Sequence, residues 1–98
     1  MPDFQTHVCL IHLEFFLAEC HSLKEKRMIL RKVKDRLRSG FHVAVAEVGY
    51  QDLWQRAVLA VAAVSAEPGP LRQLADRIRQ EVEQLAPGEL SQFHVEYF

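Results

Sequence analysis

The residues with the clearest capacity for chemistry are the lysines and arginines that crowd one segment of the chain. Residues 22–38 hold eight basic and two acidic residues, a net charge of +6, whereas residues 67–98 hold three arginines and six acids, a net charge of −3. On a helix, at about 100° per residue, five of these cations share a stripe roughly 80° wide. We call this the basic stripe; its members are Lys24, Arg27, Arg31, Lys34 and Arg38. Such a stripe suits a phosphate backbone or another acidic partner. The alternative interpretation is a solvated face, with or without salt bridges to acids of a second helix.

Lys26 does not belong to the basic stripe. The same spacing places it within the apolar arc formed by Leu23, Ile29, Leu30, Val33 and Leu37. A lysine in that arc must extend past the edge of a sheet or meet a carboxylate. Two interpretations stay open: a partly buried ion pair, or a contact with a ligand or partner.

The chain shows no clear catalytic group. An enzyme needs a nucleophile or a general base with an orienting partner, and His21 beside Ser22 is the only local candidate. Ser22 is better explained as a helix N-cap, so we predict a protein that is not an enzyme and uses no cofactor. His12, Glu14, His94 and Glu96 are expected to share one sheet face, but we favour a polar or dimer surface there over a metal site.

The periodicity predicts six elements that position these residues. Strands are expected over residues 8–16, 41–48, 54–65 and 91–98, from alternating or β-branched apolar residues. The sequence Ser22-Leu23-Lys24-Glu25 is a capping box, and it predicts a helix that runs to Ser39 with Gly40 as its C-cap. A turn is expected over residues 49–53, and Pro68-Gly69-Pro70 is expected to precede a second helix that ends before Pro87-Gly88.

The order βαββαβ predicts a single α+β domain over residues 1–98. Right-handed crossovers and a central hairpin lead to a ferredoxin-like plait, with a four-stranded antiparallel sheet in the order 4-1-3-2 and two helices on one face. The other face would be apolar in part, with Leu10 and Phe16 among its residues. Since an apolar sheet face rarely stays bare, it is a candidate homodimer surface.

This topology brings two segments to one end of the fold. The start of the first helix, at Ser22, should lie beside Glu47 and the hairpin that carries Asp52, Trp54, Gln55 and Arg56; we call these six residues the rim. A helix N-terminus with nearby cations is a ready anion site. Alternatively, Lys26 pairs with Glu47 or Asp52, and Trp54 fills a gap in the core.

Two segments of the chain resemble a known family. SLKEKR at residues 22–27 and VAEVGYQDLWQRA at residues 45–57 are similar to the YlxP-like family of small bacterial proteins of unknown function, over roughly residues 8–97. The resemblance implies a ferredoxin-like fold and no established catalytic residue. The family's genes often lie near those of translation initiation and ribosome-binding factors, which implies a link to translation. The matching positions are Ser22, Leu23, Lys24, Lys26, Arg27, Glu47, Asp52, Trp54 and Gln55.

Three functions remain in competition. The first is a non-enzymatic factor that binds RNA, with ribosomal RNA or the ribosome as partner, through Lys24, Lys26, Arg27, Arg31, Lys34 and Arg38. The second is a dimeric regulatory module that binds a small anion at the rim, and the third is a purely protein-interaction domain. We expect a cytoplasmic protein with no membrane partner. The first residues lack a basic segment of a secretory signal, and the apolar run near residues 8–17 is too short for a membrane span.

Overall fold

The computed structural model describes residues 4–98 and contains four strands and two helices. Residues 1–3, which enter both the argument against a secretory signal and the predicted domain, lie outside the described residues. The elements, in chain order, are β1 (His7–Phe16), α1 (Leu23–Gly40), β2 (Ala44–Gly49), β3 (Arg56–Ser65), α2 (Pro68–Leu85) and β4 (Leu90–Tyr97).

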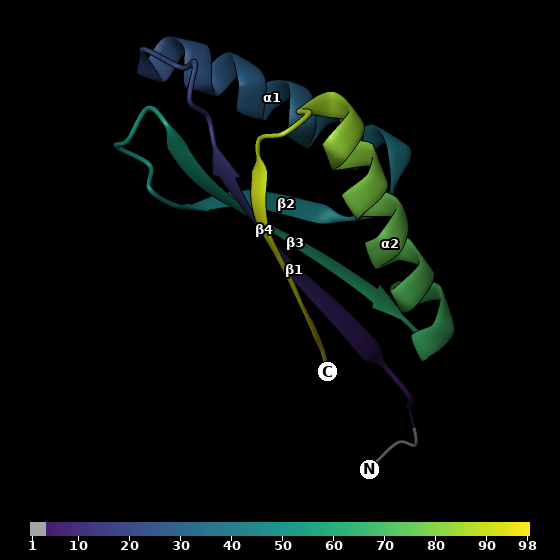
Figure 1. Cartoon of the computed structure of the whole chain (residues 1–98). Coiled ribbons are helices and arrows are strands. Elements are labelled where there is room, and N and C mark those ends of the chain that lie inside the picture. The colour runs from purple at the N-terminus through teal and green to yellow at the C-terminus, as the bar shows by residue number, and fades with distance from the viewer. Residues whose placement is uncertain (1–3) are drawn as a thin grey trace.

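The sheet has the predicted topology. Its strands are arranged β2-β3-β1-β4, which is the order 4-1-3-2 read from the opposite edge, and every neighbouring pair is antiparallel. Both helices lie on one side of the sheet (Figure 1). The α+β ferredoxin-like plait is therefore confirmed. β2 and β4 are its two edge strands.

The core lies between this sheet and the helices. Along β1, Cys9, Ile11, Leu13 and Phe15 are buried while the residues between them are not. This alternation follows from the period of two along a strand, which sends successive side chains to opposite faces. Leu30, Val33 and Leu37 of α1 close the core from the other layer.

Several predicted boundaries were wrong by a few residues. Gly40 is the last residue of α1 and Phe41 is the C-cap, because the Phe41 amide donates to the Leu37 carbonyl. β2 begins at Ala44 rather than at residue 41 and includes Gly49, and β3 begins at Arg56 rather than at residue 54. Pro68 and Pro70 lie inside the first turn of α2, where a missing N–H group removes no helical hydrogen bond.

The start of α1 is fixed by the predicted capping box. The Ser22 Oγ accepts a hydrogen bond from the Glu25 amide at 3.1 Å, and the Glu25 Oε2 accepts one from the His21 amide at 2.7 Å. The second bond reaches one residue further back than the usual capping box does. The turn between β2 and β3 lies at the same end of the molecule as this helix start (Figure 1). The topology therefore brings the two predicted segments together.

Neither helix is long and apolar enough to cross a membrane, as judged over residues 4–98.

Candidate nucleic-acid interface

The two long sides of α1 face different neighbours. Arg36 and Arg38 are two positions apart, which separates their directions by about 200° around the helix. Arg36 forms an ion pair with Glu81 of α2, whereas Arg38 donates to the Val45 carbonyl of β2 at 2.7 Å. One side of α1 therefore faces α2, and the other faces the edge strand β2. The basic stripe lies on the β2 side, because its other members fall within about 60° of Arg38.

The cations of the basic stripe remain available to solvent. Lys24, Arg27, Arg31 and Arg38 are exposed and Lys34 is half-buried. Within residues 4–98 none of the five forms an ion pair with an acid; the pairs that exist involve Lys26, Arg36, Arg56, Arg79 and His94. Acids of α2 therefore do not neutralise the stripe within the described residues, and two interpretations stay open: a solvated face, or a surface for an acidic partner. The ion pair that joins the two helices there uses Arg36, which is outside the stripe.

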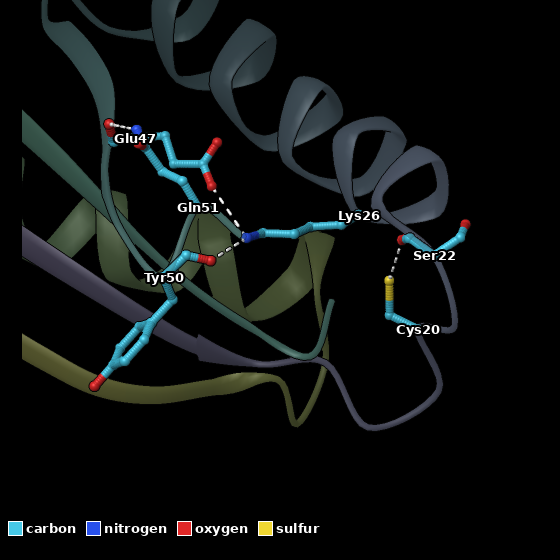
Figure 2. A network of polar contacts seen from close by, with 6 residues as sticks. All are labelled: Cys20, Ser22, Lys26, Glu47, Tyr50 and Gln51. Atoms are coloured by element: carbon cyan, nitrogen blue, oxygen red, sulfur yellow. Dashed lines mark hydrogen bonds and ion pairs between the residues drawn. The ribbon is translucent and has the colours of Figure 1, made fainter. Parts of the chain in front are cut away.

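Lys26 has a different environment from the basic stripe. It is only 2% exposed, and it points from α1 toward the hairpin of β2 and β3 (Figure 2). Its Nζ donates to the Tyr50 carbonyl at 2.6 Å and lies 3.2 Å from the Glu47 Oε2. That oxygen is buried and accepts no hydrogen bond within the described residues. Its negative charge is compensated by the ion pair with Lys26. The charge of Lys26 is thus compensated within the fold, and we leave Lys26 out of the binding surface proposed below.

The hairpin that Lys26 contacts has an uncommon backbone conformation at Tyr50. Tyr50 has a φ of 55°, a left-handed value that few residues other than glycine adopt. Its carbonyl accepts from both Lys26 and the Leu53 amide, and the Arg56 guanidinium lies 4.3 Å from the centre of its ring. Sequence reasoning did not identify Tyr50, because a backbone carbonyl carries no residue-type signal.

The remaining rim residues surround this hairpin. The Gln55 amide nitrogen donates to the Ala18 carbonyl at 3.0 Å, which ties the hairpin to the loop after β1. Arg56 pairs with Glu14 of β1. Asp52 is exposed, and Trp54 is half exposed rather than filling the core. The rim therefore comes together as predicted, but Glu47 and not Asp52 is the partner of Lys26.

The helix start within the rim is poorly suited to an anion. Ser22 is the N-cap of α1 and Glu25 lies in its first turn, so the Glu25 carboxylate places a negative charge where a bound anion would sit. The arrangement therefore does not favour the predicted small-anion module.

The polar groups elsewhere offer little reactivity. Cys9 and Cys20 are buried free thiols; burial raises the pKa of the Cys9 thiol, which keeps it protonated at neutral pH. The Cys20 thiol donates to the Ser22 carbonyl (Figure 2). His12 lies opposite His94 in the sheet, yet residues 4–98 contain no group of three His, Cys, Asp or Glu side chains able to hold a metal ion. The homodimer surface on this sheet face stays a prediction.

The fold and the site together define a class: a small ferredoxin-like plait with one strongly basic helix side and a buried lysine that fastens that helix to the central hairpin. Comparison with known proteins gives the family. The chain belongs to the DUF503 family of proteins of unknown function, whose model matches residues 8–95. The YlxP-like resemblance is confirmed by a relative from Bacillus subtilis (strain 168), the uncharacterised protein YlxP. The two are 43% identical over 53 residues, which span 54% of this chain and 58% of that relative.

Two solved structures share the architecture. The de novo designed protein Foldit4 matches with a TM-score of 0.60 at 14% identity, over 96% of this chain and 97% of its own. A variant of SnoaB, a cofactor-independent oxygenase from Streptomyces nogalater, matches with a TM-score of 0.52 at 12% identity, over 94% and 90% of the two chains. At such low identity these matches show the fold alone.

Proposed function

We propose that this protein is a non-enzymatic RNA-binding factor that contacts RNA phosphates with the basic stripe of α1. The observation that carries the proposal is the set of five cations on one side of a helix, none paired with an acid within residues 4–98. Like charges held this close repel one another unless a partner neutralises them. Solution counterions meet this need weakly, whereas a phosphate backbone meets it with several charges at once.

The geometry of the basic stripe favours a polymer over a small anion. Lys24 and Arg38 are fourteen residues apart, which corresponds to about 21 Å along the helix axis. A single phosphate or metabolite cannot reach both ends, but a nucleic-acid strand or duplex can. Arg38, at one end, is oriented by its bond to the Val45 carbonyl. The link to translation that the family resemblance implies makes ribosomal RNA the target that we propose to examine first.

The test measures binding of the full chain to a fluorescently labelled RNA hairpin and to purified bacterial ribosomal RNA by anisotropy. The test variant combines Arg27→Gln, Arg31→Gln and Lys34→Gln. The matched control combines Arg72→Gln, Arg77→Gln and Arg79→Gln, which removes the same charge from exposed positions of α2.

We expect the α1 variant to bind roughly 100-fold more weakly at about 0.1 M salt, since each phosphate contact contributes ~0.7–0.9 decades per decade of salt. The α2 control should lose far less. Equal losses in the two variants would show that only net charge matters. No binding of either RNA by the unmodified chain would overturn the proposal outright.

A further inference from the structure

A groove borders the first turns of α1 outside the basic stripe. This groove has a volume of about 540 Å³ and lies between the start of α1, the loop after β1 and the loop between α2 and β4. Phe16, Met28 and Ile29 provide much of its apolar surface. The volume is in the range of sites that hold a ligand or the side chains of a partner.

The apolar side chains of the groove are unusually exposed. Phe16 is 50% and Met28 64% exposed. Phe16 also borders a second hollow, of about 460 Å³, which is lined by Leu53 and Trp54 of the hairpin. Leu53 is 48% and Trp54 50% exposed. Aromatic residues and methionine are the types enriched where proteins dock, and tryptophan is prominent among the residues that dominate binding energy.

The charged side chains that line the groove are all acidic. Glu19, Glu25 and Glu89 line it, and no lysine or arginine of residues 4–98 does so. The Glu25 Oε2 accepts a hydrogen bond from the His21 amide, whereas the Glu25 Oε1 has no hydrogen bond within the described residues. An apolar floor with an acidic border complements a ligand that is apolar at its centre and positively charged around it. The same acids would repel RNA.

We propose that this groove docks a short segment of another protein in which a large apolar side chain is flanked by lysine or arginine. The apolar side chain occupies the hollow between Phe16 and Met28, and the flanking cations lie beside Glu19 and Glu89. The protein would thus present two binding surfaces on one helix: the basic stripe for nucleic acid, and an apolar, acidic groove beside it for a basic protein segment. This inference does not depend on the RNA-binding proposal, because the two surfaces share no residue.

The test uses a random peptide library displayed on phage, selected against the full chain, followed by affinity measurements on the enriched peptides. Two groove variants, Met28→Lys and Glu89→Lys, place a positive charge in or beside the groove. The matched control is Val64→Lys, since Val64 is 71% exposed and lies in β3, outside the groove. Unfolding midpoints of all variants establish that each one folds.

We expect the enriched peptides to carry a tryptophan, phenylalanine or leucine flanked by lysine or arginine. Both groove variants should weaken their binding by about tenfold or more, an effect of ~1.4 kcal/mol, while Val64→Lys leaves it unchanged. A selection that enriches no peptides, or peptides without excess positive charge, overturns the proposal. So does binding that survives both groove substitutions. Concentration-dependent dimers abolished by Met28→Lys would instead assign the groove to a second copy of the chain.

Discussion

Lys26 and the basic stripe lie on the same helix, yet their surroundings give them opposite roles. Lys26 is buried, and its charge is met by the Glu47 carboxylate and the Tyr50 carbonyl. The stripe cations are exposed or half-buried, and no acid of residues 4–98 pairs with them. Residue type alone therefore does not make a cation a binding residue. Burial and the presence of a partner decide whether its charge is used within the fold or offered to another molecule.

The largest effect on stability should come from Lys26→Ala. Removing one member of a buried ion pair leaves the other charge without compensation, and typical losses are about 3–5 kcal/mol. Because Glu47 is 22% exposed and retains some hydration, we expect the lower end, ~3 kcal/mol, in urea unfolding.

Two further variants sharpen this prediction. The double variant Lys26→Met with Glu47→Gln removes both charges and should recover most of the loss. Lys24→Ala removes an exposed cation two residues away and should change stability by no more than ~0.5 kcal/mol. A Lys26→Ala variant as stable as Lys24→Ala would contradict the claim that Lys26 stabilises the fold and Lys24 does not.

An intermediate effect is expected at the helix start. Ser22→Ala removes the acceptor of the Glu25 amide and should cost about 1 kcal/mol of unfolding free energy. Ser39→Ala is a suitable control, because Ser39 is exposed in the last turn of α1 and its hydroxyl donates to the Arg36 carbonyl. Equal losses at the two serines would argue that the Ser22 cap does not stabilise the helix start.

The smallest effect is expected for Arg36→Ala. Arg36 pairs with Glu81, but its side chain is 54% exposed, and exposed ion pairs contribute about 0–1 kcal/mol. Because Arg36 lies on the α2 side of α1, its removal should also lower RNA affinity less than removal of Arg31. Chemical unfolding and RNA anisotropy measure the two effects. A loss of RNA affinity equal to that of Arg31→Ala would contradict the claim that only the β2 side of α1 contacts RNA.

The sequence was sufficient to predict the element order and the apolar arc of α1, because both rest on local periodicity. The strand order then follows from right-handed crossovers and the central hairpin. The sequence also placed the helix start beside the hairpin, since topology determines that juxtaposition. The burial of Lys26 against Glu47 was one of two open interpretations, and the arc position alone could not choose between them. The exposure of Trp54 was not predicted, because the strand expected over residues 54–65 does not indicate whether its first side chain packs in the core or faces solvent.

The acid-bordered groove could not have been found from the sequence. Its residues come from the loop after β1, the first turns of α1 and the loop between α2 and β4. Glu19 and Glu89 are therefore far apart in the chain, and neither belongs to a recognisable motif. Only the pairing of β4 with β1 and the packing of α2 against α1 bring them to one surface.

The salt dependence of RNA binding tests the central claim most directly. With four or five stripe cations at phosphates, the logarithm of the association constant should fall with the logarithm of salt concentration with a slope of about −3 to −4.5. The variant that carries Arg27→Gln, Arg31→Gln and Lys34→Gln should show a slope of only about −1 to −2, and the α2 control should keep most of the original value. A slope near zero for the unmodified chain, or the same slope for both variants, would contradict the assignment of the basic stripe as the RNA-binding surface.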